Sequence, residues 1–261
     1  MKKLLYFISL ILVMCNYIVV GQNNTPKFSY SYTTISLDST VSKAENILMK
    51  NKIDSLQKQL AGKMNVVIGQ STTVLTSFFP ASPLSNLLTD MLFQYGNTFC
   101  QQYDSKQADM SLLNFGGIRN SIPKGDVTIG DIYKVLPFDN ANVVIIELKG
   151  SELTKVFQRF TDKKNQPYSQ LQIRYHNGIP FTILLNNEKI DDDRIYRLVT
   201  INFIESGGDH ILSGITFEKV IRTNALLRDV IINEIKSYTS SGKKLEFIDD
   251  ERVTIDIQYN K

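Results

Sequence analysis

Apolar residues recur at helical spacing in four segments of the chain. The first segment places Ile53, Leu56 and Leu60 between charged and polar residues, and we expect this amphipathic helix to pack on the domain. Ser82 and Pro83 form a helix start signal before the second segment. The predicted helices are Val41–Met64, Leu84–Tyr103, Ser151–Phe160 and Asn224–Tyr238.

Short apolar or alternating runs bounded by turn residues predict β-strands between these helices. The predicted strands are Met110–Leu113, Asn142–Leu148, Gln172–Tyr175, Thr182–Leu185, Tyr196–Ile201 and Arg252–Tyr259. Strands and helices mix along the chain without a regular strand–helix–strand repeat. The pattern therefore predicts an α+β fold with a central mixed β-sheet and flanking helices.

The N-terminus has the pattern of an export signal. Met1-Lys2-Lys3 supplies positive charge and Leu4–Met14 supplies an apolar stretch. Three outcomes stay open: a signal peptide over residues 1–21, a lipoprotein signal that ends before Cys15, or an uncleaved membrane anchor over Leu4–Val20. We expect an exported protein that is periplasmic, outer-membrane-associated or extracellular, with membrane contact only through an N-terminal lipid or anchor. We expect an extended lead-in over residues 22–40 and one domain over residues 41–261.

Composition adds limits to this outline. With 261 residues and 43% hydrophobic content, the chain can bury a substantial core. The net charge of +3 is small and no basic run occurs, which argues against binding to a nucleic-acid polymer. If Cys15 is removed with the leader, Cys100 is the remaining cysteine, and we expect it to be a buried thiol in the second helix.

A glycine pair after an apolar strand marks the first candidate site. The stretch runs Asn114-Phe115-Gly116-Gly117-Ile118-Arg119. Two glycines allow either a positive φ or a close approach of the backbone to a ligand. Arg119 then offers a planar, permanently charged fork that suits a phosphate or carboxylate. The alternative is a strand-to-turn junction whose arginine makes a structural salt bridge.

Two later segments place an aromatic residue beside turn-forming polar residues. Leu136-Pro137-Phe138-Asp139-Asn140 precedes an apolar strand, and Asn202-Phe203 follows another strand, six residues before Asp209 in a Gly-Gly-Asp sequence. Either phenylalanine could instead be a packing residue of the core, since aromatic side chains bury large apolar areas.

Taken in order, these segments resemble the C-terminal, substrate-binding domain of the 5'-nucleotidase and UDP-sugar hydrolase family. Its pattern is Asn-x-Gly-Gly-Ile-Arg, Leu-Pro-Phe-x-Asn, and Asn-x-Phe/Tyr followed by Gly-Gly-Asp. The stretch Pro83–Asp90 also looks like a family helix, and the resemblance runs from about Ala81 to about Leu212. The chain resembles a standalone form of this domain, without the metallophosphatase domain.

The resemblance implies roles for eight residues of this sequence. Phe138 and Phe203 would hold a nucleobase between their rings, and Asp209 would accept hydrogen bonds from ribose hydroxyls. Asn114 and Arg119 would hold ribose and phosphate oxygens, and Asn140 would reach the base edge or the sugar. Gly116 and Gly117 complete the implied substrate-binding set.

The sequence departs from the family pattern in two places. Thr76–Ser82 offers no basic residue where the family commonly has an arginine that completes a phosphate clamp. Ser169-Gln170-Leu171 stands where the family often has Ser-Gly-Leu, so we expect Gln170 to narrow the base pocket or to add hydrogen bonds there. Both departures bear on which ligand is bound.

Catalysis in the family uses two metal ions, which need a set of imidazole and carboxylate ligands. This sequence has two histidines, His176 in a turn and His210 beside Asp209, and none of the family's metal-ligand spacings. We therefore expect no metal or other cofactor in this chain, no catalytic residues, and no hydrolysis by the chain alone. The expected partners are a nucleotide or nucleoside and a separately encoded metallophosphatase chain that supplies divalent metals. The alternative is a non-catalytic exported module that retains the fold and binds a nucleoside or nucleotide, or serves only in interactions with other proteins.

Overall fold

The computed structural model describes residues 30–34, 46–246 and 251–256. The chain divides into two compact units, residues 1–53 and 54–261. The predicted export signal and most of the predicted lead-in lie outside the described residues, and residues 30–34 are exposed without regular secondary structure. Within the described ranges, no helix has the length and apolar character needed to cross a membrane.

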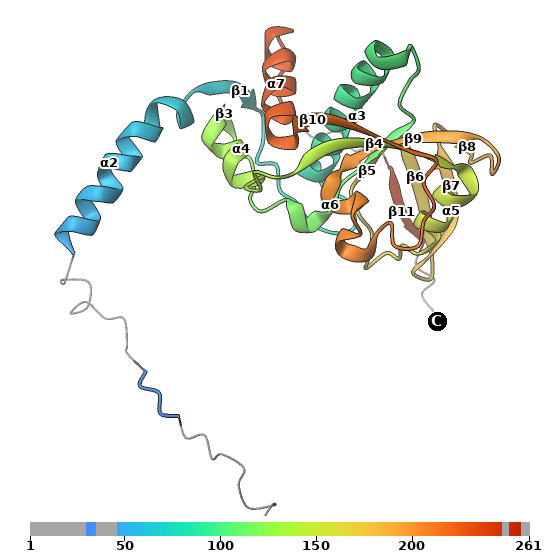
Figure 1. The fold of residues 1–261 in the computed structure, drawn as a ribbon, viewed down its shortest axis with the longest axis horizontal. Coiled ribbons are helices and arrows are strands. Elements are labelled where there is room, and N and C mark those ends of the chain that lie inside the picture. The colour runs from blue at the N-terminus through green and yellow to red at the C-terminus, as the bar shows by residue number, and fades with distance from the viewer. Residues whose placement is uncertain (1–29, 35–45, 247–250, 257–261) are drawn as a thin grey trace, which may run out of the picture. The chain divides into compact units, whose positions relative to one another are not determined.

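Helices and strands alternate irregularly along the described part of the chain (Figure 1). The helices are α2 (Ile47–Met64), α3 (Pro83–Asp104), α4 (Ile129–Val135), α5 (Gly150–Gln158), α6 (Asn202–Glu205) and α7 (Leu227–Ser240), with the 3₁₀ turns η1 (Phe115–Gly117) and η2 (Gly208–His210). The strands are β1 (Val67–Ser71), β2 (Met110–Leu112), β3 (Gly125–Thr128), β4 (Asn142–Lys149), β5 (Tyr168–Ser169), β6 (Leu171–His176), β7 (Ile179–Leu185), β8 (Glu188–Lys189), β9 (Ile195–Ile201), β10 (Lys219–Leu226) and β11 (Val253–Asp256).

The described strands form three sheets. The largest has the order β10-β4-β9-β2-β5 and is mixed, because β2 runs parallel to β9 while its other pairs are antiparallel. A second mixed sheet has the order β11-β6-β7-β8, and β1 pairs with β3. The predicted α+β fold with a mixed sheet is confirmed, and the strands are distributed over more than one sheet.

Burial follows the sequence patterns of the strands. In β4 the run Val143–Ile146 is buried without interruption, as expected where both faces of a sheet are covered. In β6 the buried Leu171, Ile173 and Tyr175 alternate with exposed residues, which is the pattern of a strand with one solvent-facing side. The largest sheet therefore lies at the centre of the core.

Most predicted elements occur, and two predictions are wrong. Residues 219–226 form β10, whereas we predicted a helix from Asn224; a left-handed Asn224, with φ of 58°, lies in this strand, and α7 begins at Leu227. The predicted packing of the first helix is also wrong for the part that belongs to the second unit, because Leu56 and Leu60 are about half exposed. Residues 257–259 of the predicted final strand lie outside the described residues.

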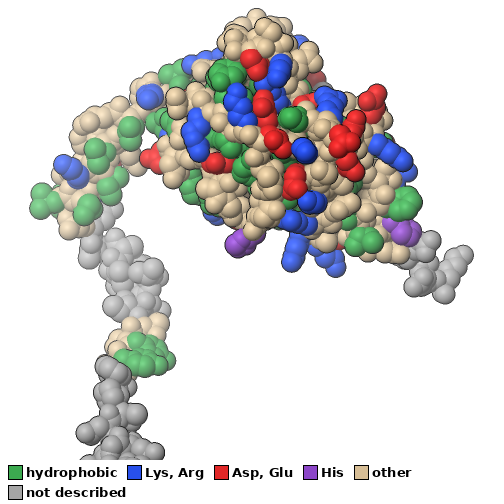
Figure 2. Space-filling model, turned by 45° about the vertical axis from the view of Figure 1, so that its right-hand side comes forward, with side chains coloured by type: hydrophobic (Ala, Val, Ile, Leu, Met, Phe, Trp, Pro, Cys, Tyr) green, Lys and Arg blue, Asp and Glu red, His purple; other side chains and the backbone are tan. Residues whose placement is uncertain are grey.

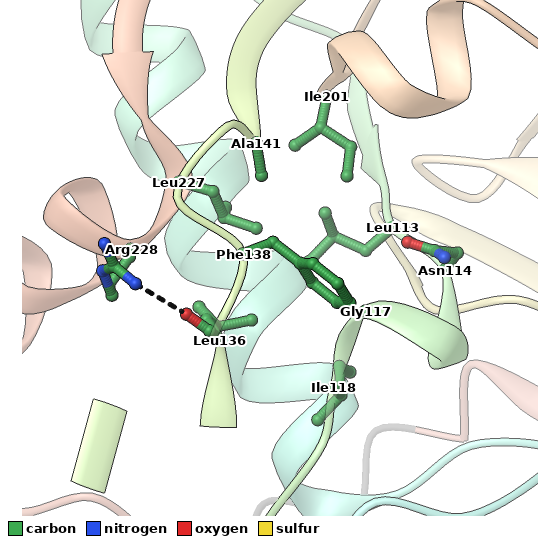
Figure 3. A pocket seen from close by; sticks show the side chains of 10 residues that line it. All are labelled: Leu113, Asn114, Gly117, Ile118, Leu136, Phe138, Ala141, Ile201, Leu227 and Arg228. Atoms are coloured by element: carbon green, nitrogen blue, oxygen red, sulfur yellow. Dashed lines mark hydrogen bonds between the residues drawn. The ribbon is translucent and has the colours of Figure 1, made fainter. Parts of the chain in front are cut away.

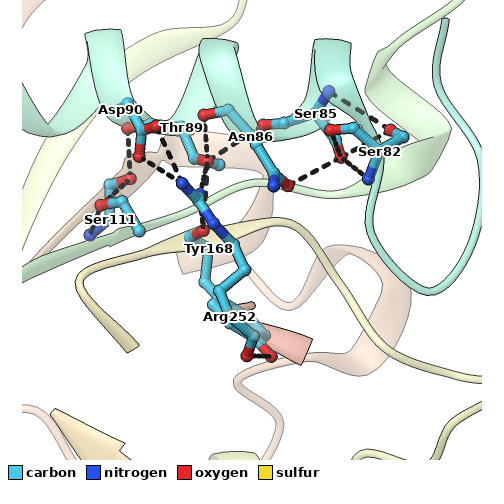
Figure 4. A network of polar contacts seen from close by, with 9 residues as sticks. Ser82, Ser85, Asn86, Thr89, Asp90, Ser111, Tyr168 and Arg252 are labelled. Carbon is cyan, nitrogen blue, oxygen red and sulfur yellow. Dashed lines mark hydrogen bonds and ion pairs between the residues drawn. The ribbon is translucent and has the colours of Figure 1, made fainter. Parts of the chain in front are cut away.

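A buried arginine joins the last strand to α3 (Figure 4). Arg252 donates two hydrogen bonds to the carboxylate of Asp90, at 2.9 and 3.1 Å, and one to the carbonyl of Tyr168 at 2.7 Å. At the start of α3, Ser82 and Ser85 form a reciprocal capping box, which confirms the predicted helix start. These contacts fix the helix that covers β2 and β5.

A second buried arginine gives the fold a predicted acid sensitivity. Arg197 lies in β9 and donates to Glu147 and Asp104, and its hydrogen bonds lower the pKa of Asp104 to about 2. A carboxylate with a depressed folded-state pKa stabilises the fold above its unfolded pKa, and this contribution is lost as the pH falls toward the folded value. We expect the melting temperature to fall from about pH 4 to pH 2, with a smaller fall for Asp104→Asn. Equal falls in both proteins would contradict this assignment.

Candidate functional site

The topology brings the three sequence motifs to one end of the largest sheet. Strand β2 runs parallel to β9, so Asn114 after β2 and Asn202 after β9 emerge at the same end. Strand β4 is antiparallel to β9 and pairs Val143 with Ile201, so the loop before β4 also lies there. This loop carries Phe138 and Asn140.

Twelve residues from these loops line one cavity of about 510 Å³. All eight residues of the predicted substrate-binding set are among them. The lining residues are Asn114, Gly116, Gly117, Arg119, Phe138, Asn140, Ala141, Ile201, Asn202, Phe203, Ser206 and Asp209. The structure thus brings together side chains that lie up to 95 positions apart in the sequence.

The polar centre of the cavity is a pair formed by Asn114 and Asp209. The Asn114 Nδ2 donates a hydrogen bond of 2.7 Å to Asp209 Oδ2. The glycine pair lies against this contact, since a Cβ on Gly116 would come within 3.3 Å of Asn114 Nδ2, and one on Gly117 within 3.0 Å of Asn114 Oδ1. Close approach, rather than positive φ, is therefore what the two glycines provide.

The backbone around Asp209 has an unusual conformation. Asp209 and His210 both lie in the left-handed region, with φ of 52° and 55°, and Gly207 precedes them with φ of 99°. Consecutive left-handed residues other than glycine are rare and cluster at functional sites. This conformation lies in the same segment that supplies the Asp209 carboxylate to the cavity.

Phe138 and Phe203 present apolar rings to the cavity. Each is 46% exposed, which is a high value for phenylalanine and argues against the alternative that they are core residues. The guanidinium carbon of Arg119 lies 5.4 Å from the centroid of the Phe138 ring. A permanently charged group therefore lies next to one of the two aromatic walls.

Gly208 sets the position of the second aromatic wall. A Cβ at Gly208 would lie 2.4 to 2.5 Å from three atoms of the Phe203 ring. Such distances are too short for real contacts, so the ring occupies space that any other residue at this position would fill. The Gly-Gly-Asp sequence thus leaves space for the Phe203 ring and also supplies the Asp209 carboxylate to the cavity.

Sequence reasoning missed four lining residues: Ala141, Ile201, Asn202 and Ser206. Of these, Asn202 has a clear structural task, because its Oδ1 accepts a hydrogen bond of 2.9 Å from the Asn142 backbone N–H. This contact joins the segment that carries Phe203 to the strand that follows Phe138. The sequence signal that could have identified Asn202 is its position directly before Phe203.

Several other singled-out residues lie elsewhere. Gln170 lines a separate cavity with Asp90 and Arg252, so the expectation that it narrows the base pocket is wrong. His176 lies near Phe181, with 6.1 Å between the ring centroids. The thiol of Cys100 is buried in α3 as predicted, and burial raises its pKa.

Charges are distributed without a dominant sign on the face shown in Figure 2, where lysine and arginine side chains intermingle with aspartate and glutamate. In the part of the chain that the structure describes, no three His, Cys, Asp or Glu side chains are grouped so that they could hold a metal ion.

The sequence is similar to curated proteins over part of their length. The chain is 29% identical to "Protein UshA" of Yersinia enterocolitica over 144 residues, which are 53% of this chain and 26% of that protein. It is 34% identical to "Protein UshA" of Escherichia coli over 113 residues, or 41% of this chain and 20% of that protein. The chain therefore spans about a quarter or less of the length of these relatives.

Solved structures share the fold. A 5'-nucleotidase precursor from Thermus thermophilus superposes with a TM-score of 0.66 at 23% identity, over 82% of this chain and 44% of that chain. The NAD nucleotidase of Haemophilus influenzae gives a TM-score of 0.60 at 16% identity, over 87% of this chain and 44% of that chain. The model of the 5'-nucleotidase C-terminal domain matches residues 61–214, which are more than half of the sequence. The chain belongs to the 5'-nucleotidase C-terminal domain family.

Proposed function

We propose that this protein binds a nucleoside or nucleotide in the 510 Å³ cavity and serves as the substrate-binding half of a 5'-nucleotidase-type phosphohydrolase. The observation that supports the proposal most strongly is that Phe138 and Phe203 line the same cavity as the hydrogen-bonded pair Asn114 and Asp209. Two half-exposed aromatic rings suit a nucleobase, because every base has a π face and stacking needs no particular base edge.

The polar residues suit the remaining parts of such a ligand. An ionised Asp209 is an acceptor only and has lone pairs beyond the one that Asn114 uses, so it can accept ribose hydroxyls. Arg119 offers paired N–H groups to phosphate oxygens. Asn140, at the rim beside Phe138, can both donate to and accept from a base edge or a sugar.

Hydrolysis requires a cluster of metal-binding side chains, and the described residues contain no such cluster. The family's chemistry depends on two metal ions, whereas the described residues that line the cavity include one carboxylate and no histidine. We propose that a separately encoded metallophosphatase chain supplies the metals and that the protein acts after export. Purified chain and metallophosphatase that neither form a complex nor release phosphate faster together than apart would contradict this part of the proposal.

A second candidate is a non-catalytic nucleoside scavenger, and one observation favours it. In the segment that commonly carries the family's additional arginine, Phe79 packs on Phe115 with ring centroids 4.2 Å apart. The segment thus brings an apolar ring, rather than a cation, to the turn that carries Gly116 and Gly117. A scavenger would bind adenosine as tightly as AMP, because little affinity would come from the phosphate.

Isothermal titration of the purified protein with adenosine, AMP and ribose 5-phosphate separates the candidates. The proposed role predicts binding of adenosine and tighter binding of AMP. Equal affinities for adenosine and AMP would support the scavenger. Binding of none of the three ligands would contradict both and leave an interaction module that retains only the fold.

Gly208→Ala is expected to weaken adenosine binding several-fold, because the added methyl group displaces the Phe203 ring. The measurement is titration of the single variant and of the same change in a Phe203→Ala background. In that background the methyl group has no ring to displace, so no further loss is expected. An equal loss in both backgrounds would show that Gly208 acts on something other than Phe203.

A further inference from the structure

Arg228 is a buried cation in the first turn of α7, directly behind the cavity wall. It is 9% exposed and lines a small pocket beside the main cavity, with which that pocket shares Phe138 and Asn114 (Figure 3). Its Nε is buried and has no hydrogen-bond partner. No ion pair to Arg228 is found in the described part of the chain.

The contacts that Arg228 does make converge on the loop that carries Phe138. Its Nη1 donates to the carbonyl oxygens of Leu136 and Pro137, both at 3.4 Å. Its guanidinium carbon lies 3.8 Å from the centroid of the Tyr133 ring in α4, just before the same loop. Arg228 therefore holds the two residues that directly precede Phe138.

The neighbouring residue holds the other end of the loop. The backbone N–H of Leu227 donates a hydrogen bond of 2.8 Å to the carbonyl of Ala141. The first two residues of α7 therefore form hydrogen bonds to the loop of residues 136–141 on both sides of Phe138 and Asn140. Phe138 and Asn140 are themselves exposed. The hydrogen bonds that Arg228 and Leu227 make to this loop lie near its two ends, so they help to set the direction of the side chains between them.

We do not expect Arg228 to increase the stability of the folded protein. Burying a charge is costly unless the charge is paired and fully hydrogen-bonded. Here two long carbonyl contacts and one aromatic face compensate it, and one N–H stays unsatisfied. A methionine of similar reach would avoid this cost, but it could not hold two carbonyls.

We propose that Arg228 is a positioning residue that fixes the Leu136–Ala141 loop so that the Phe138 ring is preset to stack on a base. It acts through the carbonyls of Leu136 and Pro137 and does not touch the ligand. The consequence for binding rests on the proposed function, whereas the consequence for the loop does not.

The loop itself gives the first test, in the absence of any ligand. We expect Arg228→Met to speed amide hydrogen exchange in residues 138–142, while the middle of α7 keeps its protection. Arg228→Lys, which retains a donor, should exchange at a rate between those of Arg228→Met and the unchanged protein. Arg159→Met is the matched control, because Arg159 Nη1 also donates to a carbonyl, that of Ser213, away from the cavity. Unchanged exchange in Arg228→Met would overturn the proposal.

Ligand binding gives the second test. We expect Arg228→Met to weaken adenosine binding roughly three- to tenfold, the effect of losing one or two weak hydrogen bonds, and to leave ribose 5-phosphate binding unchanged. In a Phe138→Ala background the same change should have little further effect, because residues that act through one another are not additive. A full additional loss in that background, or an equal loss for ribose 5-phosphate, would overturn the proposal.

The two tests also separate this inference from the proposed function. If the unchanged protein binds no adenosine, the proposed function fails, and the exchange rates still decide whether Arg228 holds the loop. If Arg228→Met does not fold, Arg228→Gln replaces it, because glutamine keeps a planar N–H donor without the charge. Faster loop exchange in that variant supports the proposal, and unchanged exchange overturns it.

Discussion

Phe138→Ala and Phe203→Ala are each expected to weaken adenosine binding by about 5- to 150-fold, since stacking on one aromatic ring contributes about 1–3 kcal/mol per base. Both rings line the cavity and both are half exposed, so each has a face available to a ligand. The double variant should show no binding at concentrations that saturate the unchanged protein. Isothermal titration measures all three affinities.

Phe181→Ala is the matched control for these variants. Phe181 is 74% exposed in β7 and does not line the cavity, so its removal takes away an exposed aromatic ring without touching the site. Its adenosine affinity should equal that of the unchanged protein. The stacking account would be contradicted if either cavity variant retained full affinity, or if all three variants lost affinity equally.

Arg119→Met is expected to weaken AMP binding about tenfold or more, while adenosine binding stays nearly constant. A hydrogen bond to a charged group contributes about 1.5–3 kcal/mol, and the lower end applies because Arg119 is exposed. Methionine keeps much of the length and apolar contact of the side chain with the Phe138 ring and removes only the charged fork. The ratio of the AMP and adenosine affinities therefore isolates the phosphate contact.

Arg174→Met controls for the general loss of positive charge. Arg174 is exposed in β6, outside the cavity, so its removal should leave the AMP-to-adenosine ratio unchanged. If Arg119→Met weakened adenosine and AMP by the same factor, Arg119 would support the Phe138 ring and would not hold phosphate.

The candidate site was largely predictable because its residues lie in short motifs at the ends of strands. Apolar strands such as Asn142–Lys149 are recognisable from sequence, and polar or glycine-rich residues directly after them mark loops. The motifs do not indicate that β2 and β4 both pair with β9. This pairing brings the loops together. The resemblance to a known family supplied that step.

Other features could not be predicted because tertiary contacts decide them. Residues 219–226 form an edge strand through pairing with β4, although their mixed polarity gives no clear alternation. Gln170 has a φ of 62° and turns to a different cavity, which its position in a sequence motif does not indicate. The exposed Leu56 and Leu60 show that an apolar stripe predicts a helix more reliably than it predicts what covers the helix.

The burial of Arg228 is another feature that the sequence does not predict. In the sequence it is an arginine at the start of a helix, where solvent exposure is the usual expectation. Only the fold shows that its guanidinium is enclosed by Tyr133 and by the carbonyls of Leu136 and Pro137. An arginine that supports a loop through backbone carbonyls in this way is not marked by a sequence motif.

The most direct test of the account is a crystal structure of the protein with AMP. We predict that the base lies between the rings of Phe138 and Phe203, that the ribose hydroxyls contact Asp209, and that the phosphate points toward Arg119. A base bound outside the 510 Å³ cavity, or a cavity that stays without nucleotide at saturating AMP, would contradict the central claim.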